Sequence, residues 1–374
     1  MKGENMKKTV SSITAVILAG AMSASLAACA NSAAESTTKA ASVSESTASE
    51  NAGSETKTAE SSVSSGNTSS SLEKVGDFPS ETITIQVPFS AGGATDIGAR
   101  HLATALTKVT GQNVVIENPT GSGGWVSWSD LLGNADKYSD GYTLGLVNHN
   151  FVFGEYDEGN QREYGLDDLQ LIANQCIDAN ALVIRKNEDR FSDASSFVEY
   201  AKSNPVLISA QATGITDGDA STAEWFNKNF DAKITVVPVD GSADGKSMFL
   251  AGDTDVYFCN VSDILSGDSD EMTPIAVFTE KRVEQLPDVP TIKEATGKEY
   301  LGFSDRGYFY PKTVDPKKAE YMAKAIQIAS EDPEYIKNMS ELGITLDTST
   351  GDDFRKTLEN QLDIRLDVWN LQKK

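Results

Sequence analysis

The chain has 374 residues, with 55 acidic against 32 basic residues, which gives a formal net charge of −23. A surface of that charge repels phosphate backbones and anionic headgroups, so it argues against nucleic acid as a partner and against membrane attachment through a basic patch. Hydrophobic residues make up 39% of the chain, which is enough for a core in two lobes once a polar segment is set aside. Three cysteines and two histidines are too few for a disulfide framework or a histidine-rich metal site, and no cofactor is expected.

The N-terminus has the pattern of an export signal. Lys7 and Lys8 precede an apolar stretch at 10–21, which is shorter than the roughly 18 residues that a membrane-spanning helix needs. The sequence Leu-Ala-Ala-Cys at 26–29 resembles the bacterial lipobox, in which the cysteine receives a diacylglycerol and becomes the first residue of the mature protein. We therefore expect a lipoprotein signal peptide at 1–28 and lipidation of Cys29. The alternative is a plain cleaved signal peptide followed by a chance cysteine.

Residues 29–75 form a polar segment behind the expected lipidation site. The segment is dominated by Ser, Ala, Thr and Glu and contains no aromatic residue, so it cannot bury enough apolar surface to offset the entropy of ordering it. We expect a disordered tether. The folded part would then be extracytoplasmic and held at the cell membrane by lipidated Cys29 alone, because acyl chains contribute about 0.8 kcal/mol per buried methylene.

Residues 76–180 alternate between short strands and helices. Residues 83–89 have the apolar, β-branched composition of a strand, and they end in the glycine-containing loop 90–96. In the helix that follows, apolar side chains recur every three to four residues up to Val109. The order of strand, loop and helix then repeats. The further strands expected are 114–118 and 142–147, with a second helix from the glycine-rich loop 121–124 through Leu132.

The same alternation continues towards the C-terminus and predicts an α/β fold with parallel strands. From residue 316 onwards the pattern is mostly helical, with a second apolar stripe from Phe354 to Trp369. The elements expected before that point are strands at 182–184, 206–210, 234–239 and 256–258, and helices at 192–203, 222–230 and 246–251.

Several of these strands run into loops rich in Gly, Ser or Thr that open helices. The loops are 90–96, 121–124, 211–221 and 240–242. In open α/β sheets ligands bind at the carboxyl ends of the strands, where free backbone N–H groups and positive helix termini suit an anion. Two lobes that each supply two such loops would clamp an anionic ligand between them.

Seven strings of the chain carry a family resemblance. The first is Val-Pro-Phe-Ser-Ala-Gly-Gly-Ala-Thr-Asp at 87–96, and the most specific is Pro-Asp-Val-Pro-Thr-Ile-Lys-Glu at 287–294. In this order along the chain, the strings resemble the solute receptors of tripartite tricarboxylate transporters, also called Bug proteins. The likeness extends from about residue 78 to the C-terminus. The remaining strings are at 111–118, 121–124, 140–144, 237–241 and 252–256.

The resemblance implies a two-lobe clamshell of the periplasmic-binding-protein type, each lobe a mainly parallel sheet flanked by helices. Residues 76–180 would form the first part of lobe 1, 181–299 lobe 2, and 300–374 the return to lobe 1 with the C-terminal helices. Such a protein is no enzyme: as a monomer it binds a small carboxylate, closes, and delivers it to a large and a small integral transporter subunit. No catalytic or metal-binding residue is expected. The expected ligand-binding residues are Phe89, Ser90, Ala91, Gly92, Gly93, Asp96, Gly121, Ser122, Gly123, Gly124, Trp125, Trp128, Asn148, His149, Thr213, Gly214, Thr216, Asp240 and Gly241.

The sequence departs from the family pattern at two places. The loop 213–219 is longer and acidic, and Asp217 and Asp219 would repel a tricarboxylate if they faced the cleft, which argues against citrate. Trp125 and Trp128 follow the glycine-rich loop, where they either pack in the core or form an aromatic wall for a flatter ligand.

Other functions are weighed against the receptor hypothesis. The same fold could act as a sensor that passes its closed form to a signalling partner. A secreted α/β hydrolase is a third hypothesis, but the chain lacks the Gly-x-Ser-x-Gly motif of a nucleophile elbow. Cys176 and Cys259 have apolar neighbours, which predicts buried free thiols over a disulfide. Asp96 either caps its helix or hydrogen-bonds a ligand.

Overall fold

The computed structural model describes residues 72–159, 162–212, 214–267 and 269–373. The chain divides into two units, 1–67 and 68–374, and the described residues belong to the second. The expected signal peptide, Cys29, most of the tether and Thr213 lie outside the described residues. Within the described ranges, none of the helices is both long enough and apolar enough to cross a membrane.

The first lobe is built on three parallel strands. Ile85 of the central strand lies beside Ile116 on one side and Leu144 on the other, and its side chain is fully buried. Helix α1 packs on β2 and on α9, and α2 packs on β3. The strands are β1 (Ile83–Gln86), β2 (Val114–Glu117) and β3 (Thr143–Val147), and the helices are α1 (Ala94–Thr110), α2 (Trp125–Gly133), α9 (Pro316–Ala329) and α10 (Pro333–Glu341).

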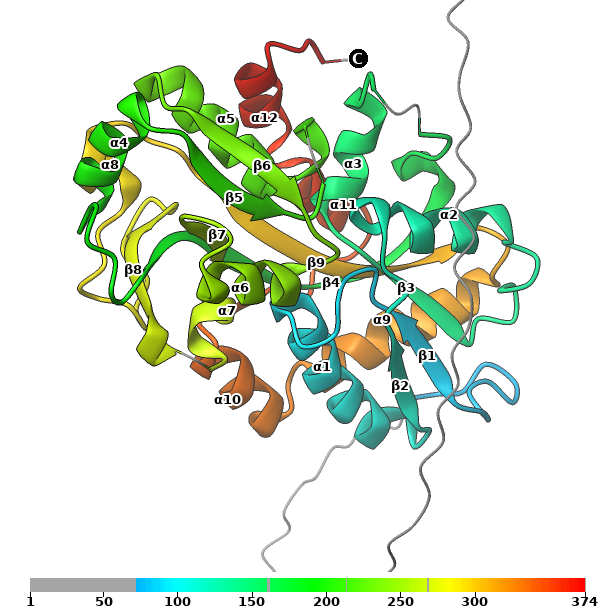
Figure 1. Ribbon diagram of the computed structural model, residues 1–374. Coiled ribbons are helices and arrows are strands. Elements are labelled where there is room, and N and C mark those ends of the chain that lie inside the picture. The colour runs from blue at the N-terminus through cyan, green and yellow to red at the C-terminus, as the bar shows by residue number, and fades with distance from the viewer. Residues whose placement is uncertain (1–71, 160–161, 213, 268, 374) are drawn as a thin grey trace, which may run out of the picture. The chain divides into compact units, whose positions relative to one another are not determined.

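Two long strands connect the lobes. The first part of β4 (Leu169–Arg185) pairs with β9 (Phe303–Pro311), and its last part pairs with β7 (Tyr257–Asn260) and β8 (Met272–Val277). These pairs are antiparallel, as is the pair of β9 with β3. Figure 1 shows β4 and β9 running across the middle of the fold. The eight-stranded sheet is therefore mixed, with parallel strands in the first lobe and antiparallel pairs along β4 and β9, while a parallel pair in the second lobe forms a sheet of its own.

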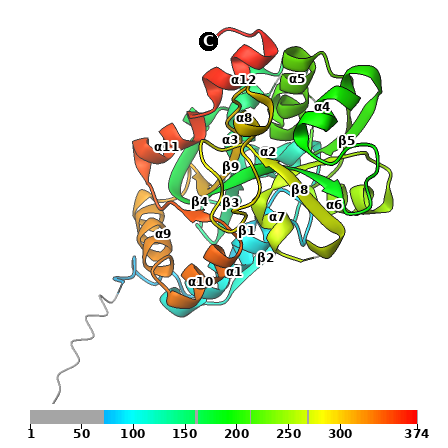
Figure 2. The ribbon, with the colours of Figure 1, turned by 90° about the vertical axis from the view of Figure 1, so that its left-hand side faces the viewer.

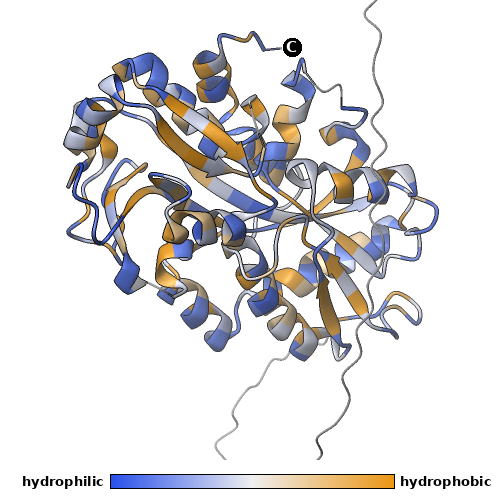
Figure 3. Cartoon of the chain, viewed as in Figure 1, coloured by the Kyte–Doolittle hydropathy of each residue, from blue (hydrophilic) through white to orange (hydrophobic). Residues whose placement is uncertain are grey.

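The second lobe contains the parallel pair β5 and β6 beside β7 and β8. Figure 3 shows that much of this pair and of β1 and β2 is hydrophobic, while the outward parts of the surrounding helices are mixed or hydrophilic. Two buried apolar clusters fill this lobe, separate from the cluster of the first lobe. Its remaining elements are β5 (Val206–Ala210), β6 (Ile234–Pro238), α4 (Ala194–Ser203), α5 (Gly218–Phe230), α6 (Ser242–Ala251), α7 (Val261–Leu265) and α8 (Ile292–Thr296).

The C-terminal segment touches both lobes. Phe354 and Leu358 of α11 (Gly351–Glu359) belong to the core of the first lobe. In α12 (Leu362–Trp369), Trp369 donates a hydrogen bond from Nε1 to Ser221 Oγ of α5 at 3.0 Å. Figure 2 shows α11 beside α9 and α12 beside α5. The apolar stripe expected from Phe354 to Trp369 is thus divided over two helices that pack on different lobes.

Most expected elements are confirmed, but the strands that join the lobes were missed. The strand expected at 182–184 is only the end of the much longer β4, and neither β8 nor β9 was expected. The reason is visible in β4, where Asn174, Gln175 and Asp178 are fully buried. These polar side chains interrupt the apolar alternation by which a strand is recognised.

Candidate ligand-binding site

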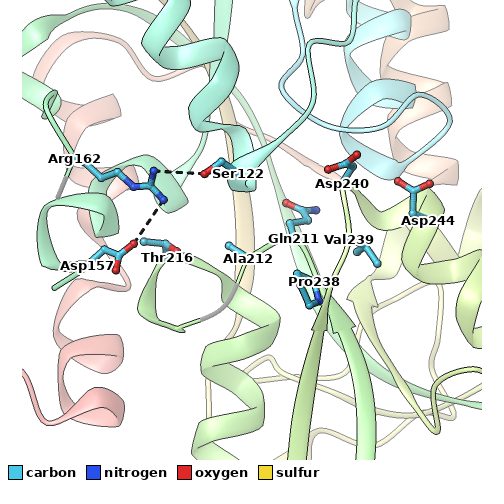
Figure 4. Close-up of a pocket in the computed structure, with 10 residues that line it drawn as sticks. All are labelled: Ser122, Asp157, Arg162, Gln211, Ala212, Thr216, Pro238, Val239, Asp240 and Asp244. Carbon is cyan, nitrogen blue, oxygen red and sulfur yellow. Dashed lines mark hydrogen bonds and ion pairs between the residues drawn. The ribbon is translucent and has the colours of Figure 1, made fainter. Parts of the chain in front are cut away.

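Two neighbouring cavities lie where loops of both lobes meet. The outer cavity has a volume of about 500 Å³ and opens to solvent. The inner cavity, of about 30 Å³, has room for one or two water-sized groups. Gln211, at the end of β5, lines both cavities. The outer cavity is lined by Ser122, Asp157, Arg162, Gln211, Ala212, Thr216, Pro238, Val239, Asp240 and Asp244 (Figure 4).

The lobes are in direct contact beside these cavities. A Cβ atom on Gly93 of the first lobe would lie 2.6 Å from Ser242 Oγ of the second. A Cβ on Gly241 of the second lobe would lie 2.1 Å from Ser90 Oγ of the first. Only glycine permits these approaches, since real Cβ atoms do not come so close to a neighbour. The structure is therefore that of a closed cleft.

Helix α1 receives an acidic partner from the other lobe. The backbone N–H of Ala94, in its first turn, donates to Asp263 Oδ1 at 3.1 Å and to Ser242 Oγ at 3.2 Å. The N-cap residue Gly93 has no side chain that could do this. The first-turn N–H group, which the sequence pattern assigned to an anionic ligand, is thus already bonded to a carboxylate of the protein.

Helix α5 is capped by a carboxylate in the same way. Asp217 accepts hydrogen bonds from the backbone N–H groups of Asp219, Ala220 and Gln211 at 2.8–3.1 Å. Its side chain is buried. Burial raises its pKa above the usual range, although these three bonds and the charge of Arg365 act in the opposite direction. The carboxylate of Asp217 therefore caps its own helix.

Asp219 differs from these two capping residues. It lines the inner cavity and is partly exposed there. The side chain of Asn180, on β4, donates a hydrogen bond to its carboxylate. Burial raises the pKa of Asp219 well above the usual range, and repulsion from Asp217 and Asp263 raises it further.

Asn180 itself has an unused acceptor. Its side chain is 5% exposed and lines the inner cavity, and its Oδ1 atom has no hydrogen-bond partner among the described residues. The amide orientation follows from the carboxylate of Asp219, which needs a donor and so takes the NH₂ group. The oxygen that remains requires a donor, because a buried acceptor without one costs about 1–3 kcal/mol.

Arg162 provides the cation of the outer cavity. Its guanidinium lies over the ring of Trp125, 4.8 Å from the ring centroid, and Nη2 is 3.6 Å from Asp157 Oδ2. Nη1 is 3.5 Å from Ser122 Oγ. The Nε group of Arg162 is buried and unpartnered within the described ranges. Figure 4 shows Arg162 on one side of the cavity and Asp240 and Asp244 on the other. Sequence reasoning missed this arginine because it follows a stretch without strand or helix pattern.

His149 faces the inner cavity with Asn148. Its Nδ1 is hydrogen-bonded to buried Asp305. Burial lowers the pKa of His149 and the charge of Arg365 lowers it further, so the neutral ring donates from Nδ1 to the carboxylate. Arg365 is fully buried nearby and donates to Asn150 Oδ1 and the carbonyl of Ile215.

Only part of the expected ligand-binding set lines the two cavities. Ser122, Thr216 and Asp240 line the outer cavity, and Asn148 and His149 the inner one. The glycines of the loops instead allow the backbones of the two lobes to approach each other closely. A Cβ on Gly123 would lie 2.8 Å from the Cβ of Ala212 in the other lobe. Elsewhere in the loops, Gly121 is partly buried and Ala91 and Gly92 are exposed, while Gly214 borders a different hollow beside Trp369.

The aromatic residues of the expected set lie in the core. Trp128 is fully buried, its Nε1 donates to the carbonyl of Leu146 at 2.8 Å, and its ring fills the space beside Gly124. Phe89 packs against Trp128, and Trp125 stacks on Phe151. The structure therefore places Trp128 and Phe89 in packing, while Trp125 reaches the outer cavity only through Arg162.

Asp96 is held in a local network. It accepts from the backbone N–H of Gly92 and from Arg100 and Asn118, at 2.8–3.0 Å. These bonds lower its pKa, although burial alone would raise it. The residue is 1% exposed. Asp96 therefore fixes the loop 90–96 against α1 and the end of β2.

The described residues contain no group of three or more His, Cys, Asp or Glu side chains placed to hold a metal ion. Cys176 and Cys259 are both free and buried, as the sequence predicted. Burial raises the pKa of Cys176 to about 12, so its thiol is not a nucleophile at neutral pH.

Comparison with known proteins identifies the family. The family model described as the tripartite tricarboxylate transporter family receptor matches residues 98–366, more than half of the chain. This protein belongs to that receptor family. The family is one of solute receptors rather than enzymes, in agreement with the expectation from the sequence.

Individual relatives and solved structures share low sequence identity with this chain. A UPF0065 protein of Pseudomonas sp. (strain P51) is 28% identical over 289 residues, which cover 74% of this chain and 82% of the relative. The periplasmic binding protein BugD is 21% identical over 79% of this chain and 100% of its own, with a TM-score of 0.72. MatC from Rhodopseudomonas palustris, solved with bound malate, is 22% identical over 78% and 100% of the two chains, with a TM-score of 0.70. These structures confirm the two-lobe α/β fold.

Proposed function

We propose that this receptor captures a small organic carboxylate between its lobes outside the cytoplasm and delivers it to a tripartite tricarboxylate-type secondary transporter. Lipidated Cys29 would anchor it, as a monomer, to the cell membrane, and the tether would leave the lobes free to reach a large and a small integral subunit. The closed form would be the one that docks.

The outer cavity carries this proposal. Its volume of about 500 Å³ falls in the range of small-molecule sites, roughly 300–1,000 Å³. Both lobes line it, so a ligand there would hold them together. Arg162 places a partly desolvated guanidinium at its edge with a buried, unpartnered Nε group. Such a group binds carboxylate with charge-assisted hydrogen bonds.

The arrangement of the lobes supports capture by hinge closure. We propose lobe boundaries at 76–180, 181–299 and 300–374. The separate apolar clusters of the two lobes support these boundaries in part, because β4 extends across the first boundary, and Tyr300 and Val368 of the last range pack in the cluster of the second lobe. A hinge would then lie in the middle of β4 and at the start of β9, where the lobes are joined by few backbone segments.

A thermal-shift screen of the purified full-length protein against mono-, di- and tricarboxylates tests the function. A ligand at 100 times its Kd adds about 2.7 kcal/mol of stability, which raises Tm by roughly 5 °C for a domain of this size. The variant Arg162→Gln should lose most of that shift. Arg355→Gln, which changes a surface arginine paired with Asp167, is the matched control. A folded protein that no carboxylate stabilises would refute the proposal.

Anchoring has its own test. Cells that express the protein are labelled with a fatty-acid analogue, and the wild type should become labelled while Cys29→Ser should not. Equal labelling of the two proteins would exclude Cys29 as the lipidation site.

A further inference from the structure

The two cavities are strongly acidic for a receptor of carboxylates. Asp157, Asp240 and Asp244 line the outer cavity with one arginine, and Asp217, Asp219 and Asp263 line the inner one. The imidazole of His149 in the inner cavity is neutral for the reason given above. A cleft lined by charges of one sign concentrates the potential within it and attracts ligands of the opposite sign. A ligand with only negative charges would meet six carboxylates, against the guanidinium of Arg162 in the outer cavity and that of buried Arg365 beside the inner one.

Positive charge reaches the carboxylates of the inner cavity from outside it: the charge of buried Arg365 acts on Asp217 and Asp219, and that of Arg306 acts on Asp263. Among the ion pairs formed by the described residues, none involves Asp217, Asp219 or Asp263. Asp217 and Asp263 use backbone N–H groups of α5 and α1, whereas Asp219 has the amide of Asn180. These N–H groups at the starts of α1 and α5 are thus bonded to carboxylates of the protein.

A second observation, on an uncharged side chain, indicates which group is missing. Asn180 Oδ1 is a buried acceptor without a partner, and Asn180 lines the inner cavity with Asp219. Two neighbouring acceptors, the carboxylate of Asp219 and Asn180 Oδ1, call for a group with several N–H bonds and a positive charge. An ammonium group has three donors and the size of a water molecule, which fits a cavity of about 30 Å³. A carboxylate neither fits that volume nor supplies a donor.

We propose that the receptor is specific for a carboxylate that also carries an ammonium group, which enters the inner cavity between Asp219 and Asn180. The rest of the ligand occupies the outer cavity, with its carboxylate towards Arg162. This inference rests on the proposed function, because it requires a ligand held between the lobes. It assigns the ligand to the amino acids and related amino carboxylates, and it excludes plain di- and tricarboxylates.

Matched pairs of probes test the inference by calorimetry on the purified full-length protein. The pairs are succinate with aspartate, glutarate with glutamate, and norleucine with lysine, because the members of each pair differ in one ammonium group. In at least one pair the aminated member should bind about tenfold or more tightly than its partner. Asp219→Asn should remove most of that difference. Asp231→Asn makes the same charge change at the exposed C-terminal end of α5 and should leave it intact.

A second variant addresses the acceptor. Asn180→Leu should weaken binding of the ligand that carries the ammonium group and have little effect on binding of its partner without that group. Circular dichroism establishes that each variant is folded. Equal binding of both members in every pair, or a preference that survives Asp219→Asn, would overturn the ammonium site and leave the receptor function standing. A folded protein that binds none of these carboxylates would overturn both.

Discussion

Asp263 Oδ1 of the second lobe accepts a hydrogen bond from the backbone N–H of Ala94 in the first, at 3.1 Å. The other carboxylate oxygen accepts from the backbone N–H of Asn260, also at 3.1 Å. One side chain thus caps a helix of each lobe, because Asn260 is the N-cap residue of α7. The closed cleft is held in part by this bridge.

Asp263→Ala should therefore loosen the closed form. It leaves the N–H of Asn260 without its acceptor and that of Ala94 with Ser242 Oγ alone, and a buried N–H group without an acceptor costs about 1–3 kcal/mol. Urea unfolding should show lower stability, and small-angle X-ray scattering of the unliganded protein should show a larger radius of gyration. Asp263→Asn keeps one acceptor oxygen, so its stability and its radius of gyration should lie between those of the alanine variant and the wild type. An alanine variant with unchanged stability and dimensions would show that the bridge is not used in solution.

Gly93→Val should prevent closure without unfolding either lobe. The first carbon of the new side chain would lie 2.6 Å from Ser242 Oγ across the cleft, so the lobes must separate for the side chain to fit. We expect ligand affinity to fall by about 100-fold or more, with a thermal unfolding curve close to that of the wild type. Gly98→Ala, on the same helix, meets only ordinary contacts at 3.6 Å or more and should retain full affinity. Full-strength binding by the valine variant would contradict the closed arrangement.

The buried pair of Arg306 and Asp178 gives a prediction for stability. Arg306 Nη2 lies 2.8 Å from Asp178 Oδ2, and both side chains are almost fully buried. Arg306→Met leaves an unpaired buried carboxylate and should cost about 3–5 kcal/mol of unfolding free energy. The double variant Arg306→Met, Asp178→Leu removes both charges and should recover much of this loss. In the exposed pair Lys324–Glu320, Lys324→Met should change stability by less than about 0.5 kcal/mol.

The acidic inner cavity makes stability depend on pH. In the folded protein the pKa of Asp219 is raised by burial and by Asp217 and Asp263, with Arg365 acting in the opposite direction. The unfolded chain therefore loses its proton first, at about pH 4. The free energy of unfolding falls as the pH rises from about 4 through the raised pKa of Asp219. Above that pKa the loss of stability stays constant.

This dependence is measured as the difference in Tm between Asp219→Asn and the wild type across about pH 4 to pH 8. The Tm of the variant should rise relative to that of the wild type as the pH rises, because asparagine has no charge to bury. Contributions of opposite sign, such as that of Asp96 with its lowered pKa, cancel in the comparison. The control Asp231→Asn should show no such trend. A flat difference for Asp219→Asn would mean that its carboxylate titrates normally.

The chain order of local elements was accessible from the sequence. The strand at 206–210 was predicted at its observed bounds, and the helices at 192–203 and 222–230 coincide largely with α4 and α5. The positions at which α9 and α10 begin are set by neighbouring residues. Asp315 and Asp332 cap the N-terminal ends of these helices, and a proline follows each of them. Periodicity, capping residues and turn residues act over a few positions, so a single sequence contains them.

The composition of the cleft was decided by tertiary structure. Asp219, Asn180 and Asp263 lie on three different elements and come together only when the chain folds. Arg162 follows a stretch without regular pattern, and Trp128 was ambiguous until the core enclosed its ring. The sequence by itself determined the family, the alternating α/β elements and the glycines that permit close approach, because these depend on local pattern. Which donors remain free for a ligand depends on contacts between distant residues, such as Ala94 with Ser242 and Asp263, which lie 148 and 169 positions away. Only the folded chain decides these contacts.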